Sequence, residues 1–355
     1  MGVRIAGTGS YLPGPPVDQD GARAFLRKYP DGLSEAAQER LLKETGILTR
    51  HFAIDVRDES RRESNTSMAA NAGRLALEAA GWCAQDVELL VVTTVVPDQL
   101  MPPTSTLVQE ALGIPRCAEV EISANCTAPY KGVSFAVSQL RLGTYRRALV
   151  CSSQYSSFLL RPPWTNPERM GANQGALRWI VSDGAGALAL ERAEPDTGLR
   201  VWLESTGCGE RSGMSLALGA TYPDLVGGFR CGDHHVMQDD RFVLRVGVPR
   251  AIAGVERMLR ELGIAPESID HFLPAVSSMQ LARGLQRLFG ERCGVPPESW
   301  RMNLTRVGYL GGVGLVLVLD EMARAGKLRA GDLVCCVAEE SSKWMSAGMV
   351  LRWNP

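Results

Sequence analysis

The feature that most constrains this chain is the alternation of short apolar runs with amphipathic stretches, which continues from one end to the other. Residues 87–95 form a β-branched run with no charge after Glu88, as in a strand that is buried on both faces. Residues 66–81 place small and apolar side chains at helical spacing, as in a closely packed helix. Strands and helices that alternate in this way predict an α/β protein.

The same order of elements occurs twice along the chain. In the first part we also expect strands at 3–7, 118–122 and 147–152, helices at 105–112 and 127–142, and a strand pair at 179–190 around a turn at 183–186. In the second part we expect helices at 248–263, 279–288 and 313–325 and strands at 269–273, 333–337 and 349–353. No Gly/Ser-rich or charged linker separates the two parts. We therefore predict two duplicated halves, residues 1–195 and 196–355, fused into one body.

One stretch interrupts the alternation. Residues 159–177 are rich in Pro, Asn and Gly, which predicts a long ordered loop, and such loops in compact enzymes often cover a site. Trp164 lies within this stretch and Trp179 lies just after it. Both are candidates for shaping a pocket for an acyl group.

The composition excludes several classes of function. The formal net charge is −1 over 355 residues, so no overall charge attracts nucleic acid or a membrane surface. No segment reaches the eighteen or more apolar residues of a membrane helix. The nine cysteines are scattered and include no CxxC pair, which argues against a zinc site or a disulfide framework. Scattered thiols in this pattern predict a protein of the reducing cytoplasm.

Cys126 is the strongest candidate for a catalytic residue. A strand at 118–122 runs through small residues into Cys126, and a helix follows at once, with Pro129 in its first turn, where proline is tolerated. A thiol at a helix N-terminus meets free amides and the positive end of the helix dipole. Both favour the thiolate, so we expect a lowered pKa and a nucleophilic sulfur. The alternative is that Cys126 is a small buried apolar residue, as free cysteines often are.

The other motifs in the sequence give weaker evidence of function. Residues 7–13 (GTGSYLP) lack the third glycine and the following helix of a dinucleotide site. The glycine-rich segments 183–186 and 311–314 are too short for phosphate loops and indicate tight turns and close packing. Among the four histidines, His235 lies in a polar turn and is the best candidate for a base.

Seven segments, in this order, match one known family. They are residues 5–13 (IAGTGSYLP), 44–50 (ETGILTR), 93–104 (TTVVPDQLMPPT), the Cys126 elbow, 183–188 (DGAGAL), 319–322 (LDEM) and 350–353 (VLRW). Over nearly its whole length the chain resembles the β-ketoacyl-ACP synthase III branch of the thiolase superfamily. The resemblance implies a thiolase-like five-layered αβαβα fold built from two duplicated halves, and usually a homodimer.

The resemblance also implies a nucleophilic cysteine at the foot of a tunnel. This tunnel admits the pantetheine arm of coenzyme A or of an acyl carrier protein. Thioesters of these carriers are then substrates, and no cofactor or metal is bound permanently. The oxyanion hole is expected from the backbone N–H of Cys126 and of Ser342, in the altered turn 339–343. Arg50 is a candidate for binding coenzyme A.

The chain departs from the family at two catalytic positions. Ala275 stands where the family has histidine, and Tyr309 stands where it has asparagine. In the family this pair donates hydrogen bonds to the enolate formed by decarboxylation. Ala275 has no polar group to offer, and Tyr309 offers one hydroxyl. Because each lost donor costs about a hundredfold in rate, efficient decarboxylative condensation is disfavoured.

These residues together predict an acyltransferase. Cys126 would carry the acyl group as a thioester and pass it from coenzyme A or a carrier protein to a small-molecule nucleophile in a natural-product pathway. Tyr309, Ser277, Ser278 and His235 are candidates for the base, although Tyr309 could equally fill space and the two serines could cap a helix. Two alternatives stay open: a decarboxylating ketosynthase with a rebuilt enolate site, and a catalytically silent partner of an active ketosynthase.

Overall fold

Two β-sheets form the frame of the molecule. The structure is a computed structural model, and it describes residues 2–29, 31–160, 164, 166–194, 198–217, 219 and 223–354. The N-terminal sheet has the strand order β1 (Gly2–Tyr11), β7 (Gly184–Ala193), β6 (Arg147–Gln154), β4 (Leu89–Thr94) and β5 (Ala118–Ser123). The C-terminal sheet has the order β8 (Arg200–Ser205), β13 (Met345–Arg352), β12 (Leu333–Glu340) and β11 (His271–Pro274).

The two sheets have the same pattern of strand directions. In the first, β1, β7 and β6 are antiparallel neighbours, and β6, β4 and β5 are parallel. In the second, β8, β13 and β12 are antiparallel, and β12 is parallel to β11. A single parallel bridge between Phe272 and Trp300 takes the place of the fifth strand. β7 ends at Ala193 and β8 begins at Arg200, on either side of the predicted division between the halves.

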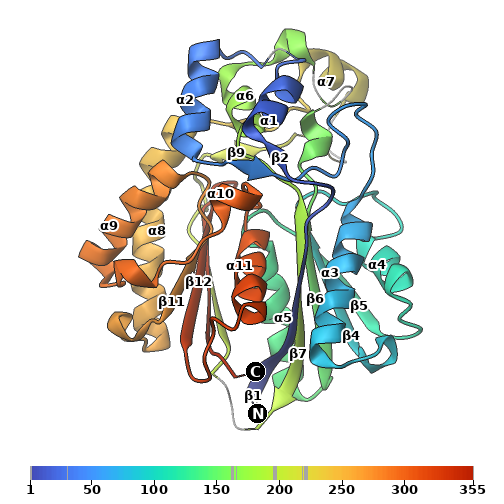
Figure 1. The fold of residues 1–355 in the computed structure, drawn as a ribbon, viewed down its shortest axis with the longest axis vertical. Helices are drawn as coiled ribbons and strands as arrows, with labels where there is room; N and C mark the ends of the chain where they lie inside the picture. The colour runs from blue at the N-terminus through green and yellow to red at the C-terminus, as the bar shows by residue number, and fades with distance from the viewer. Residues whose placement is uncertain are drawn as a thin grey trace.

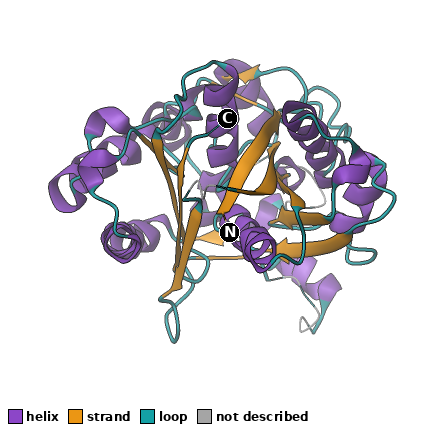
Figure 2. Ribbon diagram, turned by 90° about the horizontal axis from the view of Figure 1, so that it is seen from below, coloured by secondary structure: helices purple, strands orange, loops and turns teal. Residues whose placement is uncertain are grey.

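Helices complete five layers. Helices α5 (Ala128–Leu142) and α11 (Val313–Arg324) lie between the sheets, where their apolar side chains join the central core. Helices α3 (Asn65–Ala80) and α4 (Thr104–Leu112) cover the outer face of the N-terminal sheet. Helices α8 (Asp240–Leu262) and α9 (Met279–Cys293) cover the outer face of the other (Figures 1 and 2). This is the thiolase-like αβαβα architecture that the sequence predicted.

Small elements gather at the end of the molecule opposite the chain termini (Figure 1). The helices there are α1 (Gln19–Leu26), α2 (Glu35–Thr45), α6 (Ala172–Arg178), α7 (Leu225–Cys231) and α10 (Leu304–Val307). The short strands are β2 (Val17–Asp18), β3 (Thr49–Arg50), β9 (Met214–Ser215) and β10 (Met237–Gln238). In the described ranges no helix is both long and apolar enough to cross a membrane.

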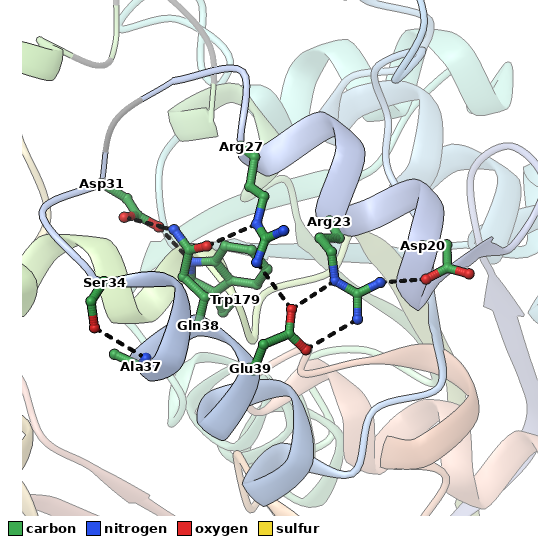
Figure 3. Close-up of polar contacts among 9 residues, drawn as sticks. All are labelled: Asp20, Arg23, Arg27, Asp31, Ser34, Ala37, Gln38, Glu39 and Trp179. Atoms are coloured by element: carbon green, nitrogen blue, oxygen red, sulfur yellow. Dashed lines mark hydrogen bonds and ion pairs between the residues drawn. The ribbon is translucent and has the colours of Figure 1, made fainter.

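Polar contacts fix α1 and α2 to the body of the molecule (Figure 3). Arg27 donates to Gln38 at 2.9 Å, and Gln38 donates to the carboxylate of Asp31 at 3.2 Å. The same carboxylate accepts the indole N–H of Trp179 at 2.6 Å. Trp179 is fully buried in this network and, unlike Trp164, is not among the described residues that line the main cavity. Trp179 therefore anchors α1 and α2 rather than shaping a pocket.

Three sequence predictions were wrong in detail. Residues 179–190 are not a strand pair, because Gly184 and Gly186 lie inside β7, where a Cβ on Gly186 would be 2.6 Å from Val316 of α11. The expected loop at 159–177 contains a 3₁₀ turn at Pro167–Arg169 and most of α6, while 161–163 and 165 lie outside the described residues. Helix α8 begins at Asp240 rather than near 248, because the Asp239 side chain caps it by accepting from Phe242 N–H.

Candidate active site

Cys126 lies at the N-terminus of α5, between the two sheets. Strand β5 ends at Ser123, and Thr127 is the N-cap residue of the helix, without a capping bond from its own side chain. The Cys126 side chain is 8 % exposed and faces the main cavity. Its Sγ lies 3.3 Å from Tyr309 Oη and 3.7 Å from Asn125 Oδ1. The elbow predicted from the sequence therefore presents its sulfur to a cavity and to a hydroxyl group.

A second helix N-terminus meets the first at this sulfur. Gly312 is the N-cap residue of α11, and a Cβ there would be 1.8 Å from the carbonyl oxygen of Cys126. At Gly311 a Cβ would be 2.7 Å from Gln154 Oε1 and 3.6 Å from Cys126 Sγ. The backbone N–H groups of Cys126 and Gly312 both act to lower the pKa of the thiol. The glycines that the sequence indicated for close packing thus let the end of α11 reach the nucleophile.

The expectation of a lowered thiol pKa was wrong. Burial raises the pKa of Cys126 to about 11, against the stabilising hydrogen bond from Tyr309 and the two backbone amides. The carboxylate of Glu340 raises this pKa further. The helix N-terminus acts in the expected direction, but desolvation of the charged form outweighs it. Cys126 is therefore a thiol at neutral pH, and its activation depends on groups that stabilise the thiolate during the reaction.

Glu340 ties the C-terminal sheet to the nucleophile's helix. It is the last residue of β12, and its Oε2 accepts the backbone N–H of Thr127 at 3.1 Å as well as the Thr127 hydroxyl. Its Oε1 accepts the hydroxyl of Ser342. Glu340 thus caps α5 from outside, which accounts for the missing local cap. The sequence showed only an altered turn at 339–343, because a contact between residues 127 and 340 leaves no local signal.

Tyr309 places its hydroxyl on the sulfur. Its backbone N–H donates to the carbonyl of Ile180 at 3.1 Å, and its own carbonyl accepts from Ser182 N–H at 3.0 Å. These bonds fix the side chain toward Cys126. Burial and the neighbouring Cys126 hold the pKa of Tyr309 well above its usual value, so it is a neutral phenol that can donate a hydrogen bond. Tyr309 therefore does more than fill space beside Ala275, with which it lines the cavity.

The main cavity has a volume of about 930 Å³ and is lined by residues from both halves of the molecule. Cys126, Tyr309, Ala275, Ser277 and Ser342 all line it. Apolar side chains from both halves complete the wall, among them Val95, Phe158, Leu160, Trp164, Ile180, Val248, Val255, Met258, Leu281 and Phe289. The volume and the apolar wall fit an acyl chain together with a second organic group.

Two predicted site residues have other roles. The Ser278 side chain caps α9 by accepting from Leu281 N–H at 3.1 Å, as the helix-cap alternative proposed. Arg50 is 1 % exposed and donates to the Trp179 carbonyl at 2.9 Å, and burial lowers its pKa to about 10. Neither is among the described residues that line the cavity. Arg50 is enclosed by protein and has no surface to offer coenzyme A, so this prediction is corrected.

Two further candidates line the cavity but have partners of their own. His235 Nε2 accepts the backbone N–H of Asn166 at 2.8 Å, and burial lowers the pKa of the ring to about 4. His235 is thus neutral, and that nitrogen is already occupied. Ser342 donates its hydroxyl to Glu340. The described contacts do not test its backbone N–H as part of an oxyanion hole, whereas the N–H of Gly312, which the sequence did not indicate, faces the sulfur.

Comparison with known proteins agrees with this geometry. The model of the 3-oxoacyl-[acyl-carrier-protein] synthase III C-terminal family matches residues 259–353. The chain is 27% identical over 355 residues to β-ketoacyl-[acyl-carrier-protein] synthase III 1 of Bacillus cereus, with 100% of both chains covered. It is 26% identical over 338 residues to the corresponding synthase of Clostridium beijerinckii, with 95% of both covered.

Solved structures show the same fold. The tetronic acid condensing enzyme AbyA1 superposes with a TM-score of 0.80 at 27% identity, covering 99% of this chain and 100% of that one. The priming β-ketosynthase of the R1128 polyketide pathway gives a TM-score of 0.81 at 22% identity, with 99% and 96% covered. These comparisons and the five layers show a thiolase-like fold. Over its whole length the chain is similar to β-ketoacyl-ACP synthase III.

Proposed function

We propose that this protein is an acyltransferase that forms a thioester on Cys126 and passes the acyl group to a nucleophile. The donor is an acyl thioester of coenzyme A or of an acyl carrier protein, and the acceptor is a small molecule of a natural-product pathway. The enzyme works as a homodimer in the cytoplasm. The similar synthases of Bacillus cereus and Clostridium beijerinckii have an acyl carrier protein in their names, which supports a carrier thioester as the donor.

One observation carries the proposal: the Cys126 sulfur lies where two helix N-termini and the Tyr309 hydroxyl meet at a large cavity. When the thiol attacks a thioester, negative charge develops on the sulfur and then on the carbonyl oxygen. Preorganised N–H and O–H donors stabilise such charge strongly in a site shielded from water. The residues needed for self-acylation are therefore present, although the polar groups that stabilise an enolate in the family are replaced by Ala275 and Tyr309.

Intact-protein mass spectrometry tests the first step. The purified chain is incubated with acetyl-CoA, octanoyl-CoA and the corresponding acyl-carrier-protein thioesters, beside Cys126→Ala and Cys208→Ser. Cys208 is an exposed free thiol and controls for non-specific acylation. We expect one acyl adduct on the native protein and on Cys208→Ser, and none on Cys126→Ala. If a folded protein gains no adduct from any donor, the transferase proposal is wrong and a silent partner subunit becomes the better explanation.

Decarboxylative condensation is the second candidate, and the comparisons favour it. The matched proteins are named as synthases, and AbyA1 as a condensing enzyme. Tyr309 offers one donor that could hold an enolate oxygen in place of the family's pair. Release of labelled carbon dioxide from malonyl-CoA or malonyl-carrier protein by the acylated enzyme would establish condensation. Transfer of the acyl group without release of carbon dioxide would establish simple acyl transfer.

A further inference from the structure

Gln154, the last residue of β6, has an amide oxygen that is open to the main cavity. The residue is 7 % exposed and is one of those that line the cavity. Its Nε2 donates to the hydroxyl of Ser156 at 3.0 Å. Its Oε1 makes no hydrogen bond with any described residue, and it is not one of the polar atoms that the protein encloses completely. Gln154 therefore presents an acceptor oxygen that a molecule in the cavity can reach.

The neighbouring backbone fixes the direction of this amide. The carboxylate of Asp183 accepts the backbone N–H of Ser156 at 2.6 Å and that of Ser157 at 2.9 Å. Ser156 is thereby held in place, and its hydroxyl accepts from the amide nitrogen of Gln154. Because the nitrogen is occupied by Ser156, the oxygen is the atom of the amide that is left for the cavity.

Gln154 Oε1 is also close to the sulfur of Cys126. A Cβ on Gly311 would be 2.7 Å from Oε1 and 3.6 Å from Cys126 Sγ, so the two atoms are neighbours of the same point. Their separation cannot exceed these two distances taken together. A hydrogen bond spans about 2.7–3.2 Å, and a reacting atom stands about 3–3.5 Å from the atom that it attacks. One substrate atom can therefore donate to Oε1 and stand beside an acyl carbon on the sulfur.

The other polar side chains at the sulfur have different contacts. The hydroxyl of Tyr309 lies 3.3 Å from Cys126 Sγ and is a neutral donor. Asn125 Oδ1 lies 3.7 Å from the same sulfur, and the amide nitrogen of Asn125 donates to Met214 at 3.1 Å. In the part of the chain that the structure describes, these contacts leave the oxygen of Gln154 as a free acceptor beside the nucleophile.

The opposite wall of the cavity suits an alkyl chain. Every described residue of α8 and α9 that lines the cavity is apolar or glycine, among them Val248, Ala251, Val255, Leu281 and Leu285. This wall has no side chain that could orient an N–H group. An acyl chain therefore fits along α8 and α9, and a polar reacting group fits at Gln154.

We propose that Gln154 binds the acceptor of the acyl group, which is a primary amine, by accepting a hydrogen bond from one of its N–H groups. This inference rests on the proposed acyl transfer and names the acceptor for the same site. The amine nitrogen attacks the thioester carbonyl of acyl-Cys126, a C–N bond forms and the C–S bond breaks. The proton that the nitrogen loses passes to the leaving sulfur, so the products are an amide and Cys126 as a thiol.

The chemistry of the two side chains explains why the acceptor is an amine. Burial raises the pKa of Cys126 to about 11, so the leaving sulfur takes up a proton at neutral pH. The amide of Gln154 does not titrate, and it can hold one N–H while the other hydrogen moves to the sulfur. An alcohol has a single hydrogen on its reacting atom, which Oε1 would hold away from the sulfur. Amines should therefore react faster than alcohols of the same size.

The test uses protein that is already acylated, which separates acceptor binding from acylation. Octanoyl-Cys126 is made with octanoyl-CoA and freed of excess reagent, and n-butylamine, 1-butanol or 1-butanethiol is then added. Intact mass follows loss of the adduct, and the same probes acting on free octanoyl-CoA give the background. We expect saturable formation of N-butyloctanamide by the native protein, at least about tenfold faster than formation of the butyl ester.

Gln154→Met removes the amide and keeps a side chain of similar length. Transfer to butanethiol is the internal reference, because S–H is a weak donor and gains little from Oε1. We expect the ratio of the butylamine rate to the butanethiol rate to fall at least about tenfold, with a higher half-saturating concentration of amine. Both rates come from the same acylated protein, so any loss of folded protein cancels.

Two further variants control for packing. Gln154→Glu keeps an acceptor oxygen at this place and should return the ratio to within about threefold of the native value. Gln286→Met is the matched control, because Gln286 of α9 also donates one hydrogen bond, to the Pro297 carbonyl at 2.7 Å, and is not among the described residues that line the cavity. Its ratio should equal that of the native protein.

Three results would overturn the assignment. An unchanged ratio in Gln154→Met would exclude a hydrogen bond from the amine to this side chain. An equal fall in Gln154→Glu would mean that the amide N–H, and not the oxygen, is what matters. No amide formation above background would exclude an amine acceptor while leaving acylation of Cys126 intact. If no octanoyl adduct forms at all, the proposed acyl transfer fails first, and the assignment of Gln154 fails with it.

Discussion

The two halves of the molecule place equivalent helices at the same point and use them differently. Helix α5 of the N-terminal half begins just after Cys126, and helix α11 of the C-terminal half begins just after its N-cap residue, Gly312. Both pack between the sheets in the central core. The first helix supplies the nucleophile. The second is preceded by two residues without side chains, Gly311 and Gly312, so that the backbone at its N-terminus can contact the Cys126 peptide.

This difference shows how a duplicated fold can make one active site rather than two. A helix N-terminus supplies free N–H groups and a positive dipole. In the N-terminal half, the N-terminus of α5 lies beside the Cys126 side chain. In the C-terminal half, the N-terminus of α11 follows two glycines and contributes only backbone groups. The absence of a side chain at Gly312 therefore leaves room for the Cys126 carbonyl oxygen, which a Cβ there would approach to 1.8 Å.

Replacing Gly312 by Ala should have the largest effect on acylation of Cys126, because it puts a side chain at the N-terminus of α11, where the native protein has none. Gly312 has φ −68° and ψ −21°, which alanine adopts freely, so only the contact matters. Its new Cβ would be 1.8 Å from the Cys126 carbonyl oxygen. We expect separation of the two helix ends, a loss of about 1–3 kcal/mol in unfolding free energy, and almost complete loss of acyl adduct by intact mass spectrometry.

Gly314→Ala is the matched control for this change. Gly314 lies in the first turn of α11, and the nearest atom to its new Cβ is Leu310 Cβ at 3.9 Å. Because alanine favours a helix over glycine by up to about 1 kcal/mol, this variant should be as stable as the native protein or more stable. Acylation that survives equally in both variants would show that contact between the helix ends is not needed.

Tyr309→Phe should have the next largest effect. It removes the side-chain hydroxyl that contacts the Cys126 sulfur and leaves the backbone donors in place. Loss of one donor to developing charge costs on the order of a hundredfold in rate, so acylation by octanoyl-CoA should slow by about that factor. The pKa of Cys126 should rise further above about 11, because the hydrogen bond from Tyr309 lowers it. Stopped-flow or quenched mass spectrometry measures the rate.

Tyr130→Phe provides the comparison. Tyr130 is also buried in the central core, but its hydroxyl has no hydrogen-bond partner among the described residues. Its removal should leave acylation unchanged and should not lower the melting temperature. Equal slowing by both variants would indicate a general packing effect, and Tyr309 would then be only a residue that fills the space beside Ala275.

Much of the fold could be predicted from the sequence because its signals are local. The apolar run at 87–95 and the helical spacing at 66–81 identified β4 and α3 to within a few residues. The Cys126 elbow was visible for the same reason, since strand, cysteine and helix follow one another directly. Residues 183–186 misled the prediction, because glycines required by the contact with α11 look like turn glycines in the sequence.

The rest of the site depends on contacts between distant parts of the chain. The Glu340 carboxylate reaches Thr127, and Gly312 reaches Cys126, across more than half of the sequence. Nothing near residue 126 shows that a carboxylate will lie beside its helix. The predicted direction of the Cys126 pKa shift was wrong for the same reason. Burial and Glu340 raise this pKa, and both effects depend on the tertiary structure.

Glu340→Gln should have the smallest effect on the reactivity of Cys126. It separates two contributions of Glu340 at the N-terminus of α5, namely its cap on the helix and its negative charge. The side-chain oxygen of glutamine can still accept from Thr127 and cap α5, but the negative charge is gone. Because that charge raises the pKa of Cys126, its removal lowers the pKa from about 11 and increases the thiolate fraction at any lower pH. Alkylation by iodoacetamide at pH 8 should therefore be roughly three- to tenfold faster. Ser342→Ala removes a hydrogen bond to Glu340 but keeps its charge, so its alkylation rate should stay near the native value. A slower rate in Glu340→Gln would mean that the cap on α5, and not the charge, is what Glu340 contributes to the nucleophile.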